Sequence, residues 1–110
     1  MIESLDRYGR YFHDHLRVEH PVGSGRQLTL GEVADDLARR LVSIFLRDAD
    51  GRRPVGGAGT LSERPGWTDQ IWFHEYFHGD TGAGLGASHQ TGWTGLVLDL
   101  IADRRLGGRR

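Results

Sequence analysis

The sequence contains no cysteine and no lysine, and it has only three prolines and one methionine in 110 residues. The lack of cysteine excludes disulfides, thiolate zinc sites and cysteine nucleophiles. No apolar run approaches the roughly 18 residues of a membrane-spanning helix, and the first residues lack the basic and apolar regions of a signal peptide. We therefore expect a cytoplasmic protein without a membrane partner.

The charges nearly cancel, because 14 arginines stand against 15 acidic residues and the formal net charge is −1. A dedicated nucleic-acid binder would be clearly basic, so nucleic acid is not an expected partner. The length fits one domain. Glycine is the excess residue, with 17 occurrences, and it gathers at turns and in residues 79–88.

Apolar residues recur at helical spacing in three stretches. The expected helices cover residues 2–16, 30–46 and 91–105. Thr29 and Glu32 form a predicted capping box at the start of the second helix. Residues 18–30 read as an irregular or hairpin-like connection, and residues 79–88 as a Gly-rich loop. The aromatic stretch 67–78 fits either a short helix or an extended segment, and the chain end at 107–110 is expected to fray.

One motif matches a metalloprotease signature literally. His74, Glu75 and His78 spell H-E-x-x-H, which on a helix turns both imidazoles toward one zinc ion and lets the glutamate polarise the bound water. Gly79 ends any such helix at once, and the additional ligands of the extended motifs are missing. We therefore expect no metal and keep a zinc-dependent hydrolase as an alternative.

Carboxylates among aromatic side chains also suit sugars, because aromatic faces stack on pyranose rings while carboxylates bind hydroxyls. Glu75 and Asp80 have this setting, and glycoside hydrolysis needs two carboxyl groups. The glycines at 82–87 lack the spacing of a phosphate-binding loop, so no cofactor is expected. A non-catalytic sugar-binding or interaction module is a further alternative.

The stretch from Trp67 to Val97, with Phe-His-Glu-Tyr-Phe-His-Gly-Asp at its centre, resembles the C-terminal end of bacterial family 63 glycoside hydrolases. Their members include mannosylglycerate-hydrolase-like and mannosyl-oligosaccharide-glucosidase-like enzymes. The segments 21–30, 40–41 and 50–54 resemble the preceding part of the same family, so the likeness covers about residues 8–102. It implies a mainly α fold, namely the C-terminal fragment of an (α/α)6 barrel with about three helices, Gly-rich loops and one short hairpin near 18–30.

The resemblance also assigns roles to individual residues. Glu75 takes the place of the general base, and the sugar-binding positions are Trp67, His78, Asp80, Gln90 and Trp93. The family's general acid lies upstream, on a part of the barrel that 110 residues cannot hold. Residues 1–106 are therefore expected to be part of an inverting α-glycosidase domain, acting on α-linked glucosides or mannosides and inactive alone. Its expected partners are a carbohydrate and the missing N-terminal barrel segment on another chain.

Overall fold

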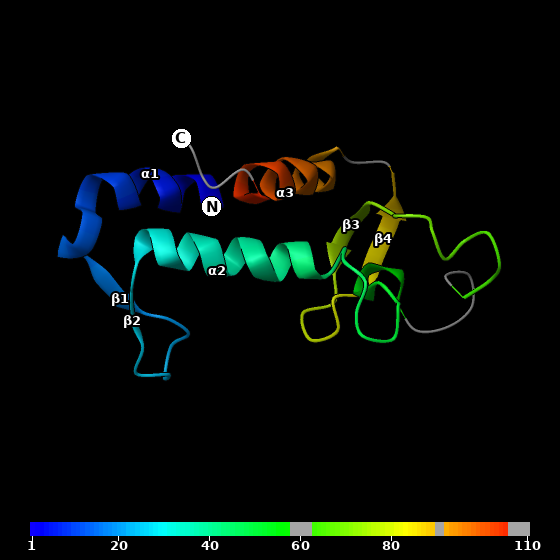
Figure 1. Ribbon diagram of the computed structural model, residues 1–110, viewed down its shortest axis with the longest axis horizontal. Coiled ribbons are helices and arrows are strands. Elements are labelled where there is room, and N and C mark those ends of the chain that lie inside the picture. The colour runs from blue at the N-terminus through cyan, green and yellow to red at the C-terminus, as the bar shows by residue number, and fades with distance from the viewer. Residues whose placement is uncertain (58–62, 90–91, 106–110) are drawn as a thin grey trace. The chain divides into compact units, whose positions relative to one another are not determined.

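The computed structural model describes residues 1–57, 63–89 and 92–105. By its internal contacts the chain divides into two compact units, Met1–Arg40 and Leu41–Arg110. The predicted tail at 107–110 lies outside the described residues. The elements follow in this order: α1 (Ile2–Phe12), η1 (His13–His15), β1 (Arg17–Glu19), β2 (Gln27–Thr29), α2 (Leu30–Ser43), η2 (Pro54–Gly56), β3 (His74–Phe77), β4 (Gly84–Ser88), η3 (Trp93–Leu96) and α3 (Val97–Arg105) (Figure 1).

In the first unit, α1 lies alongside the first turns of α2 (Figure 1). The close approach depends on Gly9, because a Cβ there would stand 2.9 Å from the backbone nitrogen of Gly31. The helix was expected to reach residue 16 but ends at Phe12. The next residue, His13, has a φ of 46° and a ψ of −131°, which lie outside the helical region, so the α-helix does not continue through it.

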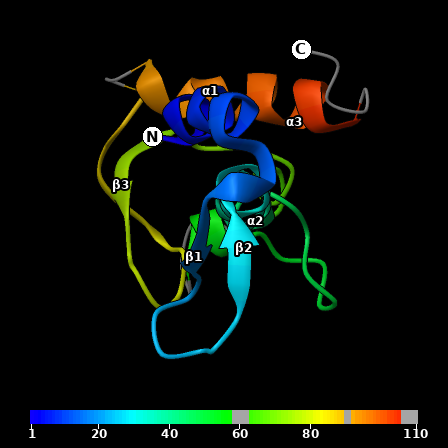
Figure 2. The ribbon, with the colours of Figure 1, turned by 90° about the vertical axis from the view of Figure 1, so that its left-hand side faces the viewer.

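The hairpin expected near 18–30 is present. β1 and β2 pair antiparallel with Val18 opposite Leu28, and the hairpin projects away from α1 (Figure 2). The predicted capping box is confirmed at the start of α2. The Glu32 N–H donates to Thr29 Oγ1 at 3.2 Å, and the Thr29 N–H donates to Glu32 Oε2 at 2.8 Å. These bonds satisfy two of the backbone groups that a helix start leaves unpaired.

The second unit has its core around Phe45, Val55 and Val97. α2 was expected to continue to about Leu46, but it ends at Ser43. The Phe45 N–H then donates to the Val42 carbonyl in a tighter turn, and the Val55 N–H donates to the Ile44 carbonyl at 2.8 Å. This departure from the helix lets Phe45 enter the core, where only 3% of its surface is exposed.

The expected mainly α fold, a fragment of an (α/α)6 barrel, is wrong. The described residues form three short α-helices and two small antiparallel sheets, of which the second pairs β3 with β4. The aromatic stretch is extended at 74–77, and the expected Gly-rich loop contains the strand 84–88. The last helix begins at Val97 instead of near residue 91. Within residues 1–57, 63–89 and 92–105, no helix is long and apolar enough to cross a membrane.

Candidate functional site

Glu75 lies at an irregularity in the β3–β4 hairpin. His74 pairs with Ser88 and Tyr76 pairs with Leu85, so Glu75 alone stands opposite the two residues Gly86 and Ala87. Two residues against one define a β-bulge, and Gly86 has the left-handed φ of 73° that one class of bulge requires at its first position. Bulges of this kind often lie beside active sites, where they redirect a side chain.

The bulge gives the Glu75 carboxylate a fixed support. The Ala87 N–H donates to Glu75 Oε2 at 3.1 Å. A Cβ on Gly86 would stand 2.4 Å from the same oxygen, so only glycine lets the carboxylate lie against β4. Among the described residues, no arginine or histidine forms an ion pair with Glu75, and the side chain is half-buried. Within the described part of the chain, the carboxylate is therefore held by a backbone N–H and not by an ion pair.

The glycines of β4 accommodate side chains of β3. A Cβ on Gly84 would stand 2.1 Å from His74 Cδ2, and a Cβ on Gly86 would also meet the Tyr76 ring at 2.7 Å. The sequence suggested that this stretch lets backbone approach a ligand. In the structure, the space beside these two glycines is instead occupied by the neighbouring strand.

Four ring side chains continue from the open end of the hairpin, where β3 begins and β4 ends. We call Trp67, Trp72, His89 and Phe73 the aromatic row. Trp67 stacks on Trp72 with centroids 5.3 Å apart and planes at 14°, and Trp72 lies 5.3 Å from His89. The His89 ring also packs edge-on against Phe73 at 5.9 Å, and the backbone N–H of His89 donates to the Phe73 carbonyl at 2.7 Å. Phe73, the member of the row just before β3, precedes Glu75 by two residues in the sequence.

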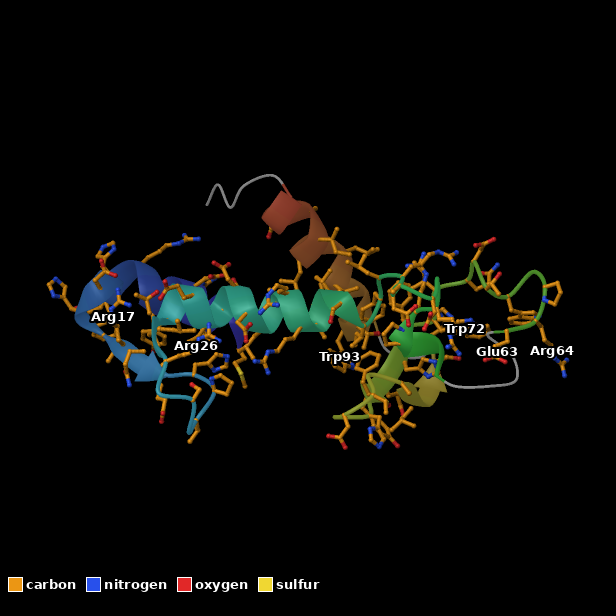
Figure 3. The ribbon with its side chains drawn as sticks, turned by 60° about the horizontal axis from the view of Figure 1, so that its bottom comes forward. Arg17, Arg26, Glu63, Arg64, Trp72 and Trp93 are labelled. Carbon is orange, nitrogen blue, oxygen red and sulfur yellow. The ribbon has the colours of Figure 1, made fainter. Side chains whose placement is uncertain are left out.

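A small pocket lies beside this row. It holds about 50 Å³ and is lined by Arg52, Arg53, Glu63, Trp67 and Trp72, among others; Figure 3 labels Glu63 and Trp72. Sites for small molecules usually hold roughly 300–1,000 Å³. The pocket is therefore too small to enclose a sugar ring.

His78 and Asp80 lie at the other, closed end of the hairpin. His78 Nδ1 accepts hydrogen bonds from the backbone N–H groups of Asp80 at 3.2 Å and Thr81 at 3.3 Å. Both His78 and Asp80 are exposed. The imidazole therefore organises the turn, and the structure does not bring these two predicted sugar-binding residues to the aromatic row.

Of the other predicted positions, Trp67 is part of the row and is 39% exposed. Trp93 belongs to η3, is 54% exposed and lies apart from Trp72 (Figure 3). Gln90 lies outside the described residues. The described positions are thus distributed over three places: the open end of the hairpin, its turn, and η3.

The zinc alternative needs His74 and His78 on one helix, but the segment is a strand. Four residues of strand put their Cα atoms roughly 13 Å apart, too far for two ligands of one ion. Among the described residues, no three side chains of the ligating types are grouped to hold a metal.

A second polar cluster lies in the first unit, around Asp36. His20 Nε2 is 2.9 Å from Asp36 Oδ2, Arg40 Nε is 2.7 Å from the same oxygen, and Arg39 binds the other oxygen. The hydrogen bond with His20 is the main cause that lowers the pKa of Asp36, and both arginines lower this pKa further. The Asp36 carboxylate therefore links the β1–β2 hairpin, through His20, to α2.

Sequence reasoning missed the bulge, the packing of His89 against Trp72 and Phe73, and the Asp36 cluster. The contact between His20 and Asp36 spans 16 residues and follows no short-range pattern.

Comparison with known proteins gives one curated relative. The chain is 45% identical over 106 residues to the uncharacterized protein YMR196W of Saccharomyces cerevisiae, and the match covers 94% of this chain. It covers 10% of the relative, so the chain spans about a tenth of the length of the curated relative that it matches. No family model and no solved structure matches the chain. The resemblance to family 63 glycoside hydrolases is therefore wrong as a family assignment: the relative is an uncharacterized protein, and no glycoside hydrolase family evidence supports it.

Proposed function

We propose that this chain is one segment of a larger carbohydrate-active protein and that Glu75 is the general base in the hydrolysis of α-linked glucosides or mannosides with inversion. The observation that carries this proposal is the support of the Glu75 carboxylate: a half-buried side chain, without an ion pair in the described residues, held by the Ala87 N–H at 3.1 Å. A general base needs a fixed position within hydrogen-bond reach of its water.

The aromatic row supports a sugar ligand. Trp67 stacks on Trp72 and is 39% exposed, so part of its indole is accessible to a pyranose ring. One member of the row, Phe73, precedes Glu75 by two residues in the sequence.

The remainder of the site has to come from additional polypeptide. An inverting pair of carboxyl groups stands roughly 6.5–9.5 Å apart, to leave room for the attacking water. The pocket beside the row holds only about 50 Å³, so the described residues around it do not enclose a sugar ring. The tenfold greater length of the yeast relative is consistent with a chain that supplies one part of a site. We further propose a cytoplasmic location, with neither a nucleic acid nor a membrane as partner.

The test replaces the matched segment of the yeast protein with this chain and assays a panel of α-linked glucosides and mannosides. We expect hydrolysis by the intact yeast protein and by the chimera, and none by the 110-residue chain alone. If neither the intact yeast protein nor the chimera hydrolyses any member of the panel, the proposed activity is wrong. Hydrolysis by the chain alone would contradict the need for an outside acid.

The stacked tryptophans favour a second candidate, a sugar-binding module without catalysis. The two candidates differ in the effect of Glu75→Gln, which keeps the shape of the side chain but cannot accept a proton. A binding module would keep its full affinity and show no turnover before or after the change. A hydrolase would lose turnover while its affinity for the sugar stayed the same.

A further inference from the structure

We propose that Gly86 is a positioning residue, which holds the Glu75 carboxylate with Oε2 fixed on β4 and Oε1 left to accept a proton. The inference rests on the proposed function of Glu75. Three observations meet at this glycine: the extra residue of the bulge, the left-handed φ of 73°, and the 2.4 Å that would separate a Cβ there from Glu75 Oε2.

The bulge leaves the backbone N–H of Ala87 available to bind the Glu75 carboxylate. In a regular antiparallel ladder, inward-facing N–H groups bind carbonyls of the partner strand. At the bulge, the Ala87 N–H donates to the side chain of Glu75 at 3.1 Å. A hydrogen bond to an ionised carboxylate is stronger than one between neutral groups, so this contact selects one orientation of a side chain that is otherwise free to rotate.

The two oxygens of Glu75 thereby acquire different roles. Oε2 is engaged by Ala87, whereas Oε1 has no hydrogen-bond partner among the described residues. In the proposed reaction, Oε1 takes a proton from water as the water oxygen bonds to the anomeric carbon. The bond from that carbon to the leaving oxygen breaks, and the leaving oxygen takes a proton from a carboxylic acid on the additional polypeptide.

Gly86→Ala tests the inference, because the methyl group would displace the carboxylate. The matched control is Gly23→Ala, which has a similar left-handed φ of 84° but nothing within 4 Å of the new Cβ. Gly23→Ala therefore measures the effect of placing alanine at a left-handed φ without a contact of the new methyl group. Glu75→Asp is a second test, since it shortens the side chain without altering the backbone at the bulge.

The first readout is the amide proton of Ala87, followed by NMR across a pH titration of the 110-residue chain. We expect this signal to shift as Glu75 loses its proton in the wild type and in Gly23→Ala. The shift should vanish in Glu75→Gln, Gly86→Ala and Glu75→Asp. An Ala87 signal that does not respond to Glu75 in the wild type overturns the inference, as does an unchanged response in Glu75→Asp or in a folded Gly86→Ala.

The second readout separates this inference from the proposed function. In the chimera, Gly86→Ala should lower kcat roughly 100-fold with little change in KM, because a small displacement of a catalytic group has an effect of that order. If Gly86→Ala breaks the hydrogen bond from the Ala87 N–H and kcat stays unchanged, the positioning role is overturned and the proposed hydrolysis stands. An inactive wild-type chimera and yeast protein, with the Ala87 response intact, would instead refute the hydrolysis.

Discussion

We expect Phe45→Ala to lower the free energy of unfolding of the second unit by more than any substitution on the surface of that unit. Phe45 is 3% exposed and lies between Phe73, with ring centroids 6.0 Å away, and Phe77, 5.6 Å away and edge-on. Phe77 belongs to β3, and Phe73 directly precedes that strand. The same ring therefore supports both the core and the strand that carries Glu75.

The expected loss follows from the burial and the two ring contacts. Replacing a buried phenylalanine by alanine costs about 3–5 kcal/mol in the free energy of unfolding. Aromatic pairs of this geometry contribute about 0.5–1.5 kcal/mol each beyond their burial, which favours the upper part of that range. Small domains have about 5–15 kcal/mol in total, so the change removes a large share.

The assay is urea unfolding followed by tryptophan fluorescence, because all three tryptophans belong to the second unit. The matched control is Tyr76→Ala, an aromatic residue beside Phe77 that is 56% exposed. We expect the control to lose less than about 1 kcal/mol. Equal losses for Phe45→Ala and Tyr76→Ala would refute the assigned core.

Three further outcomes are expected. The pKa of Asp36 in the folded chain is lowered from its ordinary 3.8. The ionised Asp36 carboxylate therefore stabilises the fold fully at pH values above 3.8, and this stabilisation is lost as the pH falls through the lowered pKa of the folded state. Asp36→Asn should therefore destabilise the chain at neutral pH and matter little in strong acid, as measured by urea unfolding; an equal effect at both would contradict the contact with His20. Thr29→Ala should cost about 1 kcal/mol in thermal unfolding because the helix cap is removed, and Thr29→Ser should restore most of it. Elemental analysis of the purified chain should find no stoichiometric zinc; about one zinc per chain, absent from His78→Ala, would show that His74 and His78 do share an ion.

Features set by near neighbours in the chain were predictable. The capping box of Thr29 and Glu32 spans three residues, and the hairpin before it is marked by Pro21, Gly23 and Gly25. Helix ends were predicted less accurately, because tertiary contacts decide them. α2 ends early at Ser43 so that Phe45 can enter the core.

The β3–β4 hairpin was not predicted, because its stability comes from packing between segments. Aromatic residues at 72, 73, 76 and 77 fit a helix as well as a strand, and the glycines of 79–88 indicate a loop by composition. Only the pairing with β3 shows that Gly84 and Gly86 make room for His74 and Glu75. Glu75 could be predicted as a candidate from its aromatic neighbours in the sequence. Its hydrogen bond with the Ala87 N–H depends on a bulge that no local sequence pattern predicts.

The central claim is that Glu75 accepts the proton of the attacking water, and one comparison tests it most directly: kcat of the chimera with Glu75 against kcat with Glu75→Gln. The matched control is Glu63→Gln, another carboxylate near the aromatic row that has no assigned part in proton transfer. General-base catalysis contributes roughly 10²–10⁴-fold, so we expect a loss of that size for Glu75→Gln, unchanged sugar affinity, and a far smaller effect for the control. Full turnover in Glu75→Gln, or equal losses in both variants, would contradict the claim.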